Sequence, residues 1–120
     1  MSHTILVVDD SPTELKLVAN ALAGNGYRIV TAIDGEEALL KAVSERPTLI
    51  VLDVVLPKKN GFQVCRQLKS AADTNHIKVV LLTSKSQQSD RSWGLRQGAD
   101  GYVTKPFADG ELLAAVTDLL

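Results

Sequence analysis

The sequence predicts an α/β fold in which five short strands alternate with five helices to form a doubly wound, open parallel sheet. Five apolar runs are suited to strands: Ile5–Val8, Ile29–Ala32, Leu49–Leu52, Val79–Leu82 and Tyr102–Val103. The first, third and fourth runs are nearly continuous Val, Ile and Leu, which is typical of central parallel strands covered on both faces. Helical patterns lie between the runs, and this alternation indicates right-handed crossovers between parallel strands.

The first two helices begin at clear capping sequences. After the first strand, Ser11 is suited to cap a helix, Pro12 to take its first position, and Glu14 to close a capping box. The apolar residues that follow recur at helical spacing: Leu15, Val18, Ala19 and Leu22. The stretch Asp34–Glu37 repeats the same capping pattern after the second strand.

The fourth and fifth helices differ in how firmly the sequence anchors them. The segment QQSDRSWGLRQ has little apolar content, and Gly94 inside it costs about 0.5–1 kcal/mol relative to Ala. Only Trp93 and Leu95 are predicted to anchor this helix. The last helix is expected to run to the final residue, with apolar positions at helical spacing: Leu112, Leu113, Val116 and Leu120. Three glycines are expected where helices stop: Gly24, Gly26 and Gly98.

Length and composition predict a single domain over residues 1–120, with no room for an output domain after the last helix. The net charge of −1 and the pI near 6.1 argue against nucleic-acid binding, which usually requires a basic excess. No apolar stretch reaches the length of a membrane span, and the N-terminus lacks a signal-peptide pattern. The single cysteine, Cys65, cannot form an internal disulfide, so we expect a cytoplasmic location for the protein. Because Cys65 falls on the apolar side of the third helix with Phe62 and Leu68, we expect it in the core.

The residues that follow the strands are the candidates for chemistry. In open parallel sheets, ligands bind beyond the carboxyl ends of the strands, where the strand order reverses. The side chains expected at that edge are Asp9, Asp10, Asp53, Thr83, Ser84, Thr104, Lys105 and Pro106. Ser11 already fills the capping position, so at least one of the adjacent residues Asp9 and Asp10 has no structural role, which favours a functional one. Asp53 lies inside an apolar run, which is a poor turn signal, so a functional role is favoured for it as well. For Lys105 a solvated loop position is equally open, Thr83 alone says nothing, and the Lys105–Pro106 bond is a candidate for the cis isomer.

The carboxylates at this edge predict a site for Mg²⁺ (or Mn²⁺). Such cations take oxygen ligands and often combine one or two carboxylates with phosphate oxygens. We expect Asp10 and Asp53 to ligate directly, Asp9 to hold a coordinated water, and the backbone carbonyl just after Asp53 to contribute. An Asp carboxylate can form an aspartyl-phosphate, and Lys105 and Thr83 suit its equatorial oxygens. The formal charges of three Asp, one divalent cation and one Lys cancel, so the cation is expected to bind before phosphate.

Four separated motifs resemble the receiver domain of two-component response regulators. They are VVDD, LIVLDVVLPKKNG, VVLLTS and GADGYVTKPF, and they occur in the family's order and at its spacing. The resemblance covers the whole chain. It implies a flavodoxin-like (βα)5 three-layer sandwich whose parallel sheet has the order 2-1-3-4-5.

The resemblance also implies the roles of the residues at the site. Asp53 is implied as the phosphoacceptor, and Asp9 and Asp10 as the acidic pair of the metal site. The backbone carbonyl of Val55 is implied as a further metal ligand. Lys105 is implied as the lysine that contacts the phosphoryl group and precedes a cis proline.

A switch and its partners follow from the same resemblance. Thr83 is implied as the switch hydroxyl and Tyr102 as the switch aromatic, with the fourth helix, fifth strand and fifth helix as the face for a downstream protein. The implied phosphodonor is a sensor histidine kinase or a phosphotransfer domain. The spacing resembles stand-alone chemotaxis receivers, and DRSWGLRQGADGYVTKPF resembles single-domain regulators of type IV pili and twitching motility.

Three alternatives remain open at the level of the sequence. The expected function is a phosphorylation-driven switch, not an enzyme that turns over outside substrates. A phosphate sink without direct output is a second possibility, and a degenerate receiver used without phosphorylation is disfavoured by the intact acidic and lysine positions. An Asp-nucleophile phosphohydrolase is disfavoured because Val54 and Val55 stand where a second catalytic acid would follow Asp53. The kinase, the target, the phosphoryl lifetime and the oligomeric state are not predicted.

Overall fold

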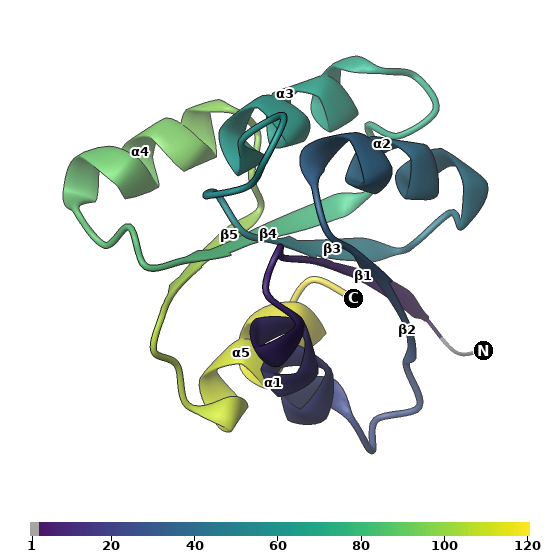
Figure 1. The fold of residues 1–120 in the computed structure, drawn as a ribbon, viewed down its shortest axis with the longest axis vertical. Helices are drawn as coiled ribbons and strands as arrows, with labels where there is room; N and C mark the ends of the chain where they lie inside the picture. Colours follow the sequence, from purple (N-terminus) through teal and green to yellow (C-terminus); the bar gives the residue numbers. More distant parts are fainter. Residues whose placement is uncertain (1–2) are drawn as a thin grey trace.

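The computed structural model describes residues 3–120 and contains the predicted alternation of strands and helices (Figure 1). In chain order the elements are β1 Thr4–Val8, α1 Pro12–Leu22, β2 Arg28–Ala32, α2 Gly35–Ser44, β3 Leu49–Leu52, α3 Gly61–Ser70, β4 Lys78–Thr83, α4 Gln88–Arg96, β5 Gly101–Thr104 and α5 Asp109–Thr117. Each predicted strand is present, and each differs from its apolar run by two residues at most.

The five strands form one parallel sheet with the order β2-β1-β3-β4-β5. This order confirms the doubly wound topology and places the reversal between β1 and β3. Helices α1 and α5 cover one face, and α2, α3 and α4 cover the other (Figure 1). Since β1 leads into α1 on one face and β3 leads into α3 on the other, a crevice opens between the carboxyl ends of these two neighbouring strands.

The strand residues alternate between two apolar clusters, one on each face of the sheet. Leu6 and Val8 of β1 pack with residues of α2 and α3, while Ile5 and Val7 pack with α1 and α5. Cys65 is fully buried in the first cluster, as expected. The central strands are therefore covered on both sides, which explains their unbroken apolar sequences.

The helix ends confirm most capping predictions and correct one boundary. Ser11 caps α1, with its side chain accepting a hydrogen bond from the Glu14 N–H, and Gly98 follows α4 with a φ of 100°. That φ lies in the left-handed region, where glycine carries no Cβ penalty. The last helix ends at Thr117 and not at Leu120, because the chain leaves the helix in a turn at Asp118 and Leu119.

Helix α4 is anchored differently from the prediction. Trp93 is 49% exposed and Leu95 50% exposed, so the expectation that they anchor the helix is wrong. Gly94 is the buried residue instead: a Cβ there would lie 2.7 Å from the Leu81 side chain and 3.1 Å from the Tyr102 ring. The glycine therefore lets the helix backbone approach β4 and β5 directly.

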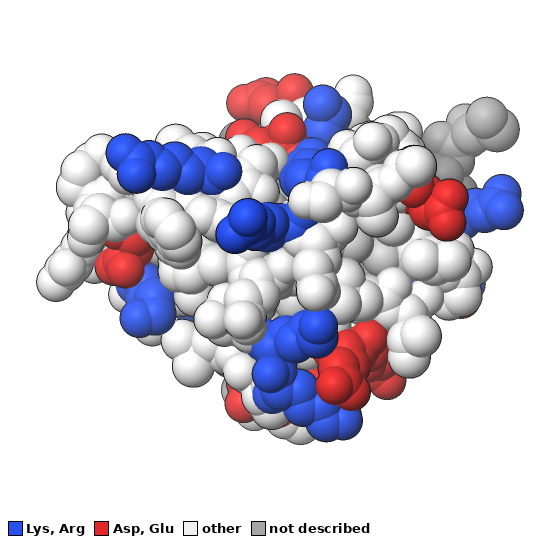
Figure 2. Space-filling view, turned by 90° about the horizontal axis from the view of Figure 1, so that it is seen from above, with Lys and Arg blue, Asp and Glu red and all other residues white. Residues whose placement is uncertain are grey.

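The surface over α2, α3 and α4 carries both signs of charge. Figure 2 looks onto this layer and shows Lys and Arg interspersed with Asp and Glu, so no single sign covers this face. Within the described part of the chain, no helix is long and apolar enough to cross a membrane.

Candidate functional site

The backbone fixes three of the predicted residues at the carboxyl edge of the sheet. The Asp9 N–H donates to the carbonyl oxygen of Ala32 at 3.1 Å, and the Asp53 N–H donates to that of Val8 at 3.0 Å. The Lys105 N–H extends the pairing of β4 and β5 in the same way. These bonds continue the ladders one step beyond the strands, so the side chains start from rigid positions.

An acidic cluster forms at the point where β1 and β3 end. Oxygen atoms of the Asp9, Asp10 and Asp53 carboxylates all lie within 4.8 Å of one another. Asp9 is 3% exposed and Asp53 8% exposed, whereas Asp10 faces solvent. An all-oxygen donor set of this kind, with one ligand open to water, suits a hard divalent cation such as Mg²⁺.

Lys105 provides a positive charge inside this cluster. Its Nζ lies 2.8 Å from Asp9 Oδ2 and 3.3 Å from Asp53 Oδ2. Burial raises the pKa of Asp53, and the Asp9 charge adds to this rise, while Lys105 opposes it. Burial alone would lower the pKa of Lys105, but its hydrogen bonds and charge interactions with the two Asp residues raise it. Three carboxylates and one ammonium leave a formal charge of −2 at this edge, and this surplus negative charge suits a divalent cation.

The loop after β3 is held tightly against the Asp53 backbone. The Gly61 N–H donates to the carbonyl oxygen of Val54 at 2.8 Å, and a Cβ on Gly61 would overlap the Asp53 carbonyl oxygen. The Val55 N–H donates to Asp53 Oδ1 at 3.2 Å, and its side chain is 57% exposed. Asp53 is therefore oriented from both its backbone and its side chain. The Val55 carbonyl as a metal ligand stays a prediction.

Thr83 and Tyr102 are connected through the backbone of Lys85. The fully buried Thr83 accepts a hydrogen bond at Oγ1 from the Lys85 N–H, and the Tyr102 hydroxyl donates to the Lys85 carbonyl oxygen at 2.7 Å. Tyr102 is 8% exposed; its ring lies beside Gly94 and under the Arg91 guanidinium, whose carbon is 5.2 Å from the ring centre. A short physical connection thus runs from the end of β4 to α4 and β5.

Two contributions were not predicted. Glu14 lies at the site, with Oε2 3.6 Å from the Lys105 Nζ, and Lys85 takes part through its backbone. The position of Glu14 one turn into the helix after Asp9 was a usable signal for the first. No side-chain pattern could have indicated a backbone role for Lys85.

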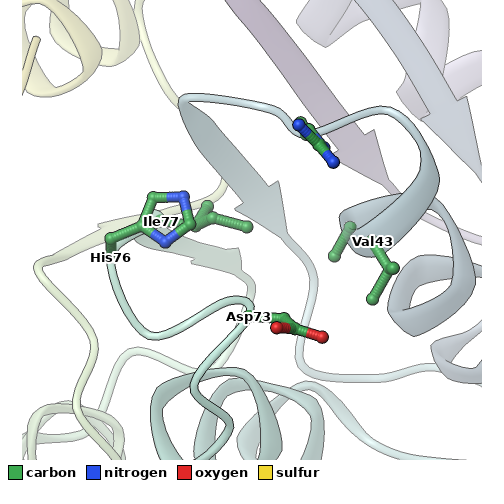
Figure 3. Close-up of a pocket in the computed structure, with 6 residues that line it drawn as sticks. Val43, Asp73, His76 and Ile77 are labelled. Carbon is green, nitrogen blue, oxygen red and sulfur yellow. The ribbon is translucent and has the colours of Figure 1, made fainter.

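A separate hollow of about 370 Å³ lies near the amino ends of the strands, opposite the candidate site. It is lined by Val43, Arg46, Asp73, His76 and Ile77 together with Ala42, from the end of α2 and the segment before β4 (Figure 3). These segments precede the amino ends of β3 and β4. The hollow therefore does not belong to the site at the carboxyl ends.

Comparisons with known proteins agree on one family. The family model described as "Response regulator receiver domain" matches residues 5–117. Similar curated proteins include the alkaline phosphatase synthesis transcriptional regulatory protein PhoP of Bacillus subtilis, 46% identical over the whole chain, and Protein PilH of Pseudomonas aeruginosa, 40% identical over 97% of it. The chain spans about half (49%) of that PhoP but 96% of PilH. Among solved structures, the Vibrio cholerae chemotaxis protein CheY4 superposes with a TM-score of 0.92 at 31% identity, covering all of both chains.

Proposed function

Because the chain belongs to the response regulator receiver domain family, we propose that it is a phosphorylation-activated switch whose phosphoacceptor is Asp53. Receiver domains act as signalling switches and bind Mg²⁺ at an acidic pocket. The observation that carries the proposal is the meeting of Asp9, Asp10 and Asp53 with Lys105 at one edge of the sheet. Asp53 accepts hydrogen bonds from the Val55 N–H and from Lys105, which orient its carboxylate at this edge.

The proposed transfer takes place between Asp53 and a phosphohistidine of a sensor kinase or phosphotransfer domain. An Asp53 carboxylate oxygen attacks phosphorus, the new O–P bond forms, and the P–N bond breaks with its electron pair going to the donor imidazole. Lys105 contacts a phosphoryl oxygen, and Thr83 contacts another. Asp9, Asp10, Asp53 and the Val55 carbonyl would hold Mg²⁺, which supplies neutralisation of charge on the phosphoryl oxygens.

The proposed output lies on the face of α4, β5 and α5. When Thr83 moves toward the phosphoryl group, its contact with the Lys85 backbone changes, and Tyr102 is bonded to the same residue. A local charge event would then alter packing at α4, where Gly94 contacts the Tyr102 ring. Hydrogen exchange with and without beryllofluoride tests this step: unchanged protection of residues 86–97 in the occupied protein would contradict it.

We further propose a cytoplasmic role in chemotaxis or type IV pilus motility. The support is the match to PilH along nearly all of both chains and to the chemotaxis protein CheY4 in structure. The match to PhoP covers only about half of that regulator, so its transcriptional role is not carried to this chain. The near-neutral charge of −1 favours a protein as the target over nucleic acid.

Phosphotransfer from a labelled donor tests the function. The parent should gain one label that depends on Mg²⁺ and that alkali and hydroxylamine remove, as expected for an acyl phosphate. Asp53→Asn should gain none, and the surface variant Asp73→Asn should match the parent. Label retained on Asp53→Asn would remove Asp53 as the acceptor. Sustained hydrolysis of a small phosphate ester would favour a phosphohydrolase instead.

A further inference from the structure

The capping box of α1 is only half formed, and this frees the carboxylate of Glu14. In a complete box the third residue of the helix accepts a hydrogen bond from the backbone N–H of the cap. At α1 the Ser11 N–H donates instead to Asp9 Oδ1 at 3.0 Å. Helix α3 provides the contrast, because Asn60 and Gln63 form both halves of its box.

The freed carboxylate of Glu14 turns toward the phosphoacceptor site. Its Oε2 lies 3.6 Å from the Lys105 Nζ, making Glu14 the third carboxylate around that ammonium. Its side chain is 36% exposed, so the charge faces incoming molecules. Glu14 also borders a groove of about 480 Å³ whose other lining residues are Leu17, Ser84, Lys105, Pro106 and Phe107. The groove opens beside Lys105, which places Glu14 at an entrance to the site.

Glu14 changes the net charge of the site in its cation-bound form. Three Asp carboxylates are offset by one divalent cation and Lys105. Glu14 adds one uncompensated negative charge next to the position where a phosphodonor must arrive. A free donor carrying two negative charges is repelled more strongly than a donor carrying one.

We propose that Glu14 is a specificity-determining residue that disfavours small dianionic phosphodonors at Asp53. The site thereby favours a phosphohistidine presented by a protein, whose own contacts offset the repulsion. This inference rests on the proposed function of Asp53 as phosphoacceptor. It assigns Glu14 an electrostatic role and no part in the bond changes.

The test compares Glu14→Gln with the parent at saturating Mg²⁺, using acetyl phosphate as a dianionic donor and phosphoramidate as a monoanionic one. The matched control is Asp118→Asn, which makes the same charge change at the exposed far end of α5. At low ionic strength, Glu14→Gln should speed phosphorylation by acetyl phosphate about 3- to 10-fold and by phosphoramidate about 2- to 3-fold. In about 1 M salt both gains should fall below about 1.5-fold. Asp118→Asn should match the parent throughout.

A binding measurement gives a second readout that is independent of the reaction. Calorimetric titration should show Mg²⁺ binding weakened up to about 3-fold in Glu14→Gln, since one nearby negative charge is lost. Equal effects on both donors, a gain that does not respond to salt, or a slower reaction would overturn the proposal and leave Glu14 as a support for Lys105. If the parent itself gains no label from either donor, the proposed function of Asp53 fails instead.

Discussion

Lys105→Met should destabilise the protein strongly in chelator and much less in Mg²⁺. In the structure the Lys105 ammonium lies 2.8 Å from Asp9 and 3.3 Å from Asp53, and its side chain is only 15% exposed. Methionine keeps most of the apolar stem but removes the charge. Two carboxylates that are mostly buried would then face each other without a cation.

The magnitude follows from burial and from the cost of adding a proton. Removing one partner of a buried ion pair costs about 3–5 kcal/mol, and the residual exposure of Lys105 lowers this to about 2–4 kcal/mol. The upper limit is set by protonation: binding one proton at pH 7 to a carboxyl of ordinary pKa near 4 costs about 4 kcal/mol, at about 1.36 kcal/mol per pH unit. The loss in free energy of unfolding of Lys105→Met cannot be much larger than this cost, because one carboxyl can always take up a proton instead.

The pH dependence has a definite sign. Burial and Asp9 already raise the pKa of Asp53 in the parent, and loss of Lys105 removes the main opposing influence. A carboxyl with a raised pKa binds its proton more tightly in the folded state, so its contribution is most favourable below its unfolded pKa and is lost as pH rises through the folded pKa. The defect of Lys105→Met should therefore shrink by up to about 1.4 kcal/mol for each pH unit below 7.

Urea unfolding at pH 7, in EDTA and in saturating Mg²⁺, measures the effect. Lys69→Met is the matched control, because Lys69 also lies 2.8 Å from a carboxylate, that of Asp100, and is 20% exposed, but far from the acidic cluster. Both variants should lose stability in EDTA, and only Lys105→Met should recover part of it in Mg²⁺. Equal stability of Lys105→Met and the parent in EDTA would refute the reasoning, as would equal recovery of both variants.

Three further predictions concern the packing of two glycines and of the buried cysteine. Gly94→Ala should lower the free energy of unfolding by about 1 kcal/mol, because its Cβ would lie 3.1 Å from the Tyr102 ring. The loss is expected even though Ala favours helices over Gly by about the same amount. Urea unfolding should show the lower stability, and tyrosine absorbance should show a more exposed ring. Gly61→Ala should cost more, about 2–4 kcal/mol, since its Cβ would lie 2.7 Å from the Val54 backbone, and unchanged unfolding would contradict this. The Cys65 thiol is buried with its pKa raised to about 11, so a disulfide reagent at pH 8 should label it at least about 100-fold faster in urea than in buffer.

The fold was predictable where local pattern and tertiary packing agree. The apolar runs of β1, β3 and β4 coincide with the strands because these residues are buried on both faces. The run Tyr102–Val103 was weak, and β5 extends to Gly101–Thr104 because pairing with β4 orders its flanking residues. Helix α4 was misjudged since hydropathy credits large side chains, whereas close approach here depends on the missing side chain of Gly94.

The sequence was enough to predict which residues gather at the candidate site but not which of their side chains contact one another. Strand order alone brings Asp9, Asp53 and Lys105 to one edge, so no side-chain detail was needed to group them. Which carboxylates Lys105 contacts depends on loop geometry and on side-chain directions. The same limit explains Glu14: its use in a capping box was the local expectation, and Asp9 displaced it from that role.

The arrangement of charges also gives a physical reason for the order of binding. Lys105 interacts with the same two carboxylates that a cation would share, so a cation that binds there weakens the hold of Asp9 and Asp53 on the ammonium. In the proposed function, Lys105 would then be available to a phosphoryl oxygen, which it could not contact fully while offsetting two Asp charges. By linkage, a phosphoryl group that engages Lys105 must in turn tighten cation binding by the same factor. Mg²⁺ and the phosphoryl group should therefore bind cooperatively, with Lys105 as the group that couples them.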